Sequence, residues 1–162
     1  YTGLRIGLSE AKGLAYALKL PLIGVDTLKL LAATAMFSSS YDGEEYFIPM
    51  VDARRMEVYA SVFDAQLNKL HDTAALVIDA HSFEDLLADH RIWLFGDGAP
   101  KLKAVFEGNA HVQIVDGFTP SAAFMAPLVA QDWQEQKFVD VAYFEPFYLK
   151  DFVAGKPHVK GL

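Results

Sequence analysis

The first forty residues alternate between helical and extended hydrophobic patterns. From Leu4 to Leu18, apolar residues recur every three or four positions, which is the spacing of a helix with one buried face. Pro21 ends this helix because the residue before a proline avoids the helical region. The predicted elements are, in order, a helix over 3–19, a buried strand over 22–25, and a helix over 28–36 capped by Asp26 or Thr27. A strand placed between helices is typical of an α/β fold with a mostly parallel sheet.

A polar stretch, residues 38–43, interrupts this pattern and is the best candidate for a domain boundary, although an ordinary surface loop fits it equally well. We therefore divide the chain into a first part, 1–40, and a second part, 41–162. The second part opens with two strand-like runs that predict a hairpin. Its predicted elements are strands over 46–51 and 56–63, a short helix over 83–89, a strand over 92–95, a helix from Pro100, a strand over 112–115, a helix over 119–135 and an extended aromatic end over 144–150.

The composition is that of a folded chain, with 52% apolar and 22% charged residues. The formal net charge of −7 disfavours tight direct binding to a phosphate backbone. The sequence has no cysteine, which excludes disulfides, thiolate metal ligands and thiol catalysis within it. No apolar run approaches the roughly 18 residues that a membrane span requires, so we expect a cytoplasmic protein.

The chain opens abruptly. Tyr1 is followed at once by the first helical pattern, with no methionine and no strand before it. This helix therefore has no preceding strand to supply a sheet, and we expect that part of the folding unit lies upstream.

Gly96, Asp97 and Gly98 lie between a predicted strand and a predicted helix. Backbone N–H groups at such a turn attract anions, which makes the motif a candidate nucleotide-binding loop. It is not a Walker loop, because no Gly-Lys-Ser/Thr follows, and it is not a dinucleotide fingerprint, because Lys101 occupies the position of the third glycine. A tight turn that binds nothing is the simpler interpretation, and both stay open.

Asp52, Arg54 and Arg55 lie at the turn of the predicted hairpin. The alternation of a strand puts Asp52 and Arg54 on one face, where they can pair, and points Arg55 away. Two arginines are suited to a phosphate or to a partner's carboxylate, and a surface ion pair of small energetic worth is the equal alternative. Ala53 and Arg54 stand where a phosphate-clamping hairpin would have glycine, so backbone approach to a phosphate is obstructed.

The sequence contains no recognisable catalytic or metal-binding constellation. The five histidines are scattered, and none lies four positions from another. The adjacent Glu44 and Glu45 would face opposite sides of a strand rather than act as an acid–base pair. No serine lies in a nucleophile elbow. We therefore expect no metal site and no catalytic residue.

A stripe of small residues runs along the first predicted helix, because residues four apart share one face: Gly3, Gly7, Ala11 and Ala15. Such a stripe lets another element approach closely. Packing against a sheet of the same protein is the simpler interpretation, and an inter-subunit helix bundle is the other.

Five stretches resemble the TsaB (YeaZ) family, in the family's order. The first, residues 2–15, begins Thr-Gly-Leu-Arg-Ile-Gly-Leu-Ser. The others are Pro-Leu-Ile-Gly-Val over 21–25 with Thr27 and Leu28, Asp-Ala-Arg-Arg-Met-Glu-Val-Tyr over 52–59, Gly-Asp-Gly-Ala over 96–99 and Pro-Phe-Tyr-Leu over 146–149. The similarity spans essentially the whole chain, but the family's leading Gly-Pro-Gly-Ser-Phe and the first strands of its first lobe are absent.

The resemblance implies an α/β, actin-like ATPase fold (ASKHA, ribonuclease H-like) of two lobes, with the first lobe incomplete and the nucleotide machinery degenerate. It also implies a non-catalytic scaffold that activates the related subunit TsaD in threonylcarbamoyladenosine modification of tRNAs reading codons that start with A. The ATPase TsaE joins the complex, and this chain is expected to contact tRNA only as part of that complex. Carried over to this chain, the TsaD interface comprises Gly3, Gly7, Leu8, Ala11, Leu28 and Leu31.

The same resemblance bears on ligands and assembly. The isolated chain is expected to carry no cofactor, and ATP or ADP is a candidate only at the interface of the complex. When the partner is absent, a homodimer through the same helix surface is plausible, since an apolar helix face would otherwise be exposed.

Two other functions compete with the scaffold. An actin-like ATPase or kinase would bind its nucleotide at residues 96–98 and take its catalytic aspartate from the missing strands. The catalytic subunit itself would carry a metal-binding histidine motif in the missing part. Measuring ATP turnover by the full-length protein distinguishes the ATPase or kinase from the scaffold, and measuring its metal content distinguishes the catalytic subunit. The glycoprotease activity once ascribed to such proteins has no support in these residues.

Overall fold

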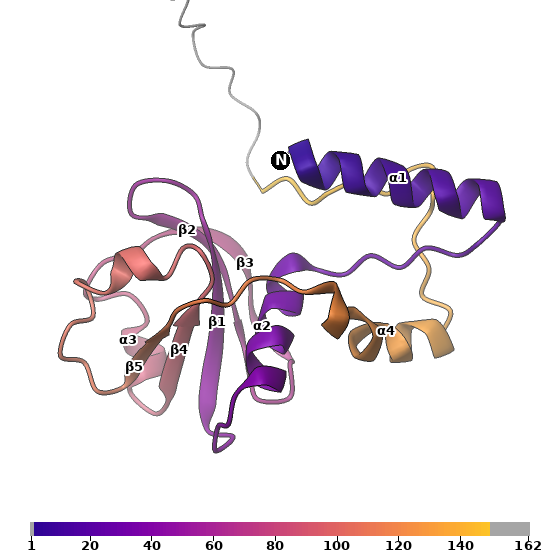
Figure 1. The fold of residues 1–162 in the computed structure, drawn as a ribbon. Helices are drawn as coiled ribbons and strands as arrows, with labels where there is room; N and C mark the ends of the chain where they lie inside the picture. The colour runs from indigo at the N-terminus through magenta and orange to yellow at the C-terminus, as the bar shows by residue number, and fades with distance from the viewer. Residues whose placement is uncertain (1, 150–162) are drawn as a thin grey trace, which may run out of the picture.

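The computed structural model describes residues 2–149, so the end of the expected extended segment and the last residues of the second part lie outside the described residues. A mixed sheet forms the body of the molecule, and one long helix stands apart from it (Figure 1). The α-helices are α1 (Thr2–Leu18), α2 (Thr27–Ser38), α3 (Glu84–Leu87) and α4 (Met125–Gln134). The strands are β1 (Glu45–Asp52), β2 (Glu57–Phe63), β3 (Lys69–Val77), β4 (Arg91–Phe95) and β5 (Val112–Val115).

The five strands lie in the order β3-β2-β1-β4-β5. β1, β4 and β5 run parallel, whereas β2 pairs antiparallel with both β1 and β3. Because β1 and β4 are parallel neighbours, their carboxyl ends lie at the same edge of the sheet. The α/β class expected from the sequence is confirmed, with a sheet that is parallel on one side and antiparallel on the other.

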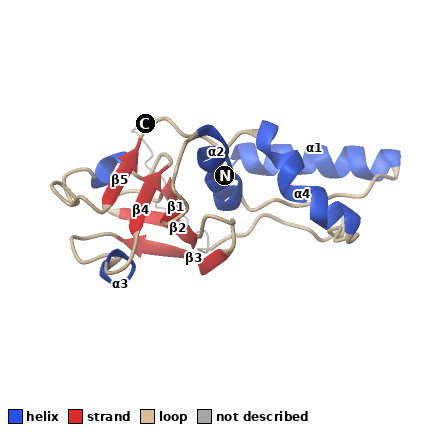
Figure 2. Ribbon diagram, turned by 90° about the horizontal axis from the view of Figure 1, so that it is seen from below, coloured by secondary structure: helices blue, strands red, loops and turns tan. Residues whose placement is uncertain are grey.

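β1 is the central strand and is buried on both faces. On one face Phe47 packs with Phe63 and Phe95 beneath α2. On the other, Ile48 and Met50 belong to a second core that α3 covers. Figure 2 shows α2 and α3 on opposite sides of the sheet. Successive side chains of a strand point to opposite faces, so the near-continuous apolar sequence of β1 supplies two cores at once.

α2 begins after Asp26, one of the two predicted N-caps. Oδ1 of Asp26 accepts hydrogen bonds from the N–H groups of Leu28 at 2.7 Å and Lys29 at 3.2 Å. The carboxylate satisfies two donors that have no partner within the helix, and it lies at the positive end of the helix dipole. The helix then buries Leu31 and Ala32 against the sheet. α2 thus contributes to the core of the second part of the chain, and the division at residue 40 stays a prediction.

The predicted strand over 22–25 is wrong. Leu22 forms one isolated antiparallel bridge with Val139, and the residues after it lead directly to the cap of α2. A short apolar run becomes a strand only where a neighbour supplies hydrogen bonds along its length. Within residues 2–149 the sheet does not extend to this segment.

Three other expectations about the elements need correction. The helix predicted from Pro100 is a single 3-10 turn, the predicted helix over 83–89 is reduced to α3, and the helix predicted over 119–135 starts as a 3-10 turn before α4. The pattern of apolar residues also gave no sign of β3. This strand is polar and exposed in its first half because it lies at the edge of the sheet.

α1 is held by a segment from the far end of the chain, residues 139–148, which we call the C-terminal strap (Figure 1). Nζ of Lys12 donates hydrogen bonds to the carbonyl oxygens of Ala142 at 2.9 Å and Phe144 at 3.0 Å. Nε of Arg5 donates to the hydroxyl of Tyr148 at 2.8 Å. These contacts position a helix that the sheet itself does not support.

We predict that Lys12→Met loosens α1 without affecting the sheet. The substitution removes two hydrogen bonds to a charged donor, which at a part-exposed site contribute about 1–2 kcal/mol. The amides of α1 should therefore exchange with solvent roughly 5- to 30-fold faster in hydrogen-exchange measurements. Lys19→Met, at an exposed position directly after the same helix, is the control and should leave the exchange of α1 unchanged. Equal loss of protection in β1 would contradict this account.

Candidate partner interface

One face of α1 carries apolar and small residues that are open to solvent. The side chains of Leu4, Leu14 and Leu18 are 53%, 57% and 62% exposed. A Cβ added at Gly3 or Gly7 would meet nothing within 4 Å. By contrast, Ala15 on the strap side is buried.

Five residues of this face follow the spacing of a helix–helix seam, of which Ala11 is half-buried and the others are exposed: Leu4, Gly7, Ala11, Leu14 and Leu18. Their intervals of three and four residues match the inward-facing positions of a heptad, and at 3.6 residues per turn they span about 80° of the helix. We call this set the α1 seam. Glycine and alanine at its centre let a second helix approach closely.

The six residues assigned to the interface by resemblance fall into three groups. Gly3 and Gly7 are exposed, whereas Leu8 and Ala11 are half-buried. Leu28 and Leu31 are only 4% and 1% exposed. These two leucines pack against the sheet with Phe47 and Phe95, so in this structure they are core residues that offer no surface to a partner.

The structure brings the other two predicted motifs together at the carboxyl ends of β1 and β4. The backbone N–H of Asp52 donates to Oδ1 of Asp97 at 2.9 Å. Nζ of Lys101 forms an ion pair with Asp52 and donates to the carbonyl oxygen of Glu57 at 2.7 Å. The parallel pairing of β1 and β4 explains this meeting, which the sequence could not show because 45 residues separate the two aspartates.

The predicted pairing of the Asp52 and Arg54 side chains is wrong. The Asp52 carboxylate instead accepts hydrogen bonds from Lys101 Nζ and from the backbone N–H of Arg54, the latter at 3.1 Å. The bond from Lys101, together with that from the Arg54 backbone, holds the pKa of Asp52 below its ordinary value. Sequence reasoning missed Lys101 as the partner, because it considered this lysine only as a departure from a glycine motif.

The glycine turn is filled by the chain's own atoms. A Cβ at Gly96 would overlap the carbonyl oxygen of Met50 and lie 2.8 Å from Cδ2 of Leu31. A Cβ at Gly98 would lie 3.0 Å from Cγ1 of Val58, and its N–H already donates to Met50 O at 3.2 Å. The missing side chains therefore allow the turn to pack closely on β1. This geometry favours the tight-turn interpretation.

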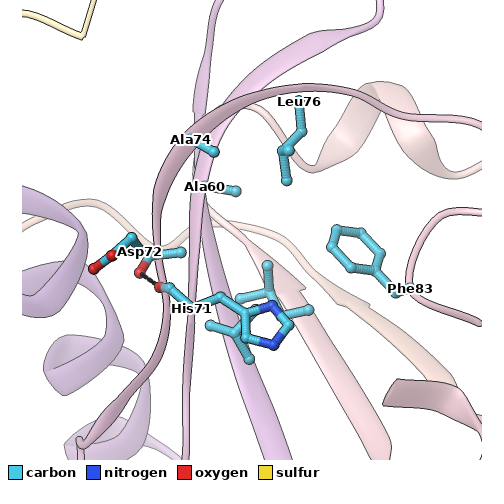
Figure 3. Close-up of a pocket in the computed structure, with 9 residues that line it drawn as sticks. Ala60, His71, Asp72, Ala74, Leu76 and Phe83 are labelled. Carbon is cyan, nitrogen blue, oxygen red and sulfur yellow. Dashed lines mark hydrogen bonds between the residues drawn. The ribbon is translucent and has the colours of Figure 1, made fainter. Parts of the chain in front are cut away.

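A small pocket lies between β2, β3 and the loop before α3 (Figure 3). Its volume is ≈ 120 Å³, and its lining includes Ala60, His71, Leu76 and Phe83. The hydroxyl of Ser61 in its wall donates to the carbonyl oxygen of His71 at 2.6 Å. The pocket is smaller than the roughly 300–1,000 Å³ of typical small-molecule sites, so we assign it no ligand.

Residues 2–149 contain no group of three or more His, Cys, Asp or Glu side chains arranged to hold a metal ion. None of the helices in this range is long and apolar enough to cross a membrane.

Comparison with known proteins first defines the class. The family model described as TsaD, tRNA N6-adenosine threonylcarbamoyltransferase, matches residues 1–126. Two solved structures from Pseudomonas aeruginosa share the fold at 24% sequence identity: a protein described as similar to peptidase YEAZ, with a TM-score of 0.77, and YeaZ, with a TM-score of 0.74. They cover 93% and 92% of this chain, and the chain covers 68% and 69% of theirs. The molecule is therefore a TsaD-like domain of the actin-like (ASKHA) class.

Two curated relatives then specify the family. The tRNA threonylcarbamoyladenosine biosynthesis protein TsaB of Escherichia coli (strain K12) is 32% identical over 96% of this chain, and the protein of the same name from Bacillus subtilis (strain 168) is 31% identical over 93%. The chain belongs to the TsaB (YeaZ) family. It spans 68% and 65% of the length of these relatives.

We predict that Gly96→Ala destabilises the fold far more than Gly108→Ala. Both glycines have positive φ angles, 98° and 80°, which cost an alanine roughly 1–2 kcal/mol. Only Gly96 has backbone atoms where the new Cβ would lie, which adds about 1–3 kcal/mol. Urea denaturation should therefore show a loss of roughly 2–5 kcal/mol in the free energy of unfolding for Gly96→Ala. Equal losses in the two variants would refute the packing role of the turn.

Proposed function

We propose that this chain is the scaffold portion of a cytoplasmic protein that activates TsaD in the threonylcarbamoyladenosine modification of tRNA. Both curated relatives are named for this biosynthesis. The observation that carries the proposal is this family membership, and the α1 seam, an apolar helix face with small central residues that is open to solvent within residues 2–149, is the surface that we assign to the partner. TsaD and TsaE are its expected partners, and tRNA is met through the complex.

The glycine turn supports a scaffold rather than a nucleotide-dependent catalyst. A loop that cradles phosphate needs free N–H groups and room beside them. Here the N–H of Gly98 is bonded to β1, and an atom added at Gly96 or Gly98 would meet the protein itself. The neighbouring hairpin turn carries Arg54 and Arg55 at positive φ, where glycine would be relaxed. Neither loop has the backbone geometry of a phosphate cradle.

The α1 seam is suited to pack against a second helix, because knobs from the partner can fill the positions left by Gly7 and Ala11. Its binding energy is limited, however. Complete burial of a leucine contributes about 1.5–3 kcal/mol, so burying the exposed halves of Leu4, Leu14 and Leu18 contributes roughly 2–5 kcal/mol. Even with an equal contribution from the partner, this barely meets the roughly 4–15 kcal/mol that association costs. A stable complex with TsaD therefore needs a second area of contact.

We predict that Gly7→Leu weakens the complex with TsaD by at least about 10-fold, because a bulky side chain at the centre of the seam blocks close helix approach. Calorimetry of the full-length protein with TsaD of the same organism, with and without ATP, measures the dissociation constant. Threonylcarbamoylation of tRNA by the mixture should fall in parallel.

Gly13→Leu is the matched control. Gly13 is also exposed, and a Cβ there meets nothing within 4 Å, but it lies off the seam. The control makes the same substitution in the same helix and should bind TsaD within about threefold of the unaltered protein. If Gly7→Leu binds like this control, the seam is not the interface. If the unaltered protein does not bind TsaD at all, the scaffold function itself is wrong.

A further inference from the structure

The turn between β1 and β2, residues 53–56, holds two consecutive arginines in the left-handed region. The φ angles are 71° at Arg54 and 52° at Arg55. This conformation strains residues with a Cβ, and glycine or asparagine would relieve it. The other described non-glycine residues with positive φ each stand alone: Lys19, Leu67, Phe83 and Gln136. Two consecutive arginines in a strained backbone conformation indicate that these positions are occupied for their side chains and not for a relaxed turn geometry.

The turn is fixed at its base. The N–H of Ala53 donates to the carbonyl oxygen of Glu57, and the N–H of Glu57 donates to that of Arg54, both at 3.1 Å. Asp52, the last residue of β1, is bonded to both Lys101 and the Asp97 carboxylate. The turn therefore presents its two arginine side chains from a rigid support, which reduces the entropy lost when they bind.

Both guanidinium groups are available for a partner. Arg54 and Arg55 are exposed, and no ion pair or side-chain hydrogen bond within residues 2–149 involves either guanidinium. The other two arginines of the chain are engaged, Arg5 by Tyr148 and Arg91 by Asp42 and Glu45. The carboxylate of Asp52, which would otherwise pair with Arg54, is taken by Lys101.

We infer that Arg54 and Arg55 bind carboxylate groups on the surface of TsaD and form the second area of contact beside the α1 seam. This inference rests on the proposed function. A planar guanidinium can donate two parallel hydrogen bonds to one carboxylate, which is a bidentate ion pair. In Figure 1 the β1–β2 turn and α1 both lie toward the upper side of the molecule.

A protein carboxylate fits this turn better than the phosphates of RNA. The chain has a net charge of −7, which repels an extended polyanion but not a single carboxylate on a mixed surface. Two exposed acidic residues, Asp52 and Asp97, also lie directly beside the turn. A protein surface with both acidic and basic groups can complement this arrangement, its carboxylates pairing with the arginines and its basic groups with the neighbouring aspartates.

The test is the dissociation constant for TsaD of the full-length protein with Arg54→Gln and Arg55→Gln combined. We expect binding about 10- to 100-fold weaker at low salt, and a dependence on salt concentration that is smaller than that of the unaltered protein. Replacing both arginines with lysine keeps the charge but removes the planar fork, and should give an intermediate loss. The control, Lys103→Gln with Lys137→Gln, removes two positive charges from exposed sites elsewhere and should change binding less than about threefold.

A glycine pair separates recognition from folding. Arg54→Gly with Arg55→Gly relaxes the turn, so this variant should melt no lower than the unaltered protein and yet bind TsaD as weakly as the glutamine pair. Binding of either pair with unchanged affinity overturns the inference and leaves the scaffold function standing. Failure of the unaltered protein to bind TsaD overturns both. If the assembled complex with the glutamine pair loses affinity only for tRNA, the turn contacts RNA phosphate and the carboxylate inference is wrong.

Discussion

The position of β1, buried on both faces, is the constraint on which the rest of the structure depends. Its side chains form the centre of both cores, and α2, β2 and β4 all pack directly on it. The absence of a side chain at Gly96 lets the turn after β4 lie against the backbone of Met50. That close approach places Asp97 and Lys101 where they bind Asp52, so the geometry of the hairpin turn follows from the packing of one glycine.

α1 is positioned by a different kind of interaction. It has no large core contact, and the C-terminal strap holds it through the hydrogen bonds of Lys12 and Arg5. The β1–β2 turn, by contrast, is fixed at its base by backbone hydrogen bonds. The two surfaces that we propose for the partner are therefore held differently: an apolar helix face held by polar contacts of the strap, and a charged turn built into the sheet.

The sequence predicted those features that depend on local pattern. The helical spacing of α1, the cap at Asp26 and the two strands of the hairpin were all visible along the chain, because each is determined by residues close to one another. What failed depended on neighbours distant in sequence. Residues 22–25 looked like a strand but had no strand to pair with within residues 2–149. Lys101 could be recognised as the partner of Asp52 only once β1 and β4 were known to be parallel neighbours.

The glycine turn, residues 96–98, and the β1–β2 turn, residues 53–56, lie at the same edge of the sheet. A loop binds an anion through its backbone only if its N–H groups are free and glycine keeps the approach open. Here Gly98 uses its N–H internally, and arginines occupy the strained positions of the neighbouring turn. A ligand at this edge would therefore be bound by charged side chains and not by backbone N–H groups. Exposed arginine side chains are suited to contact the surface of another protein. An edge of this kind is suited to a protein partner, which is what the proposed function requires of it.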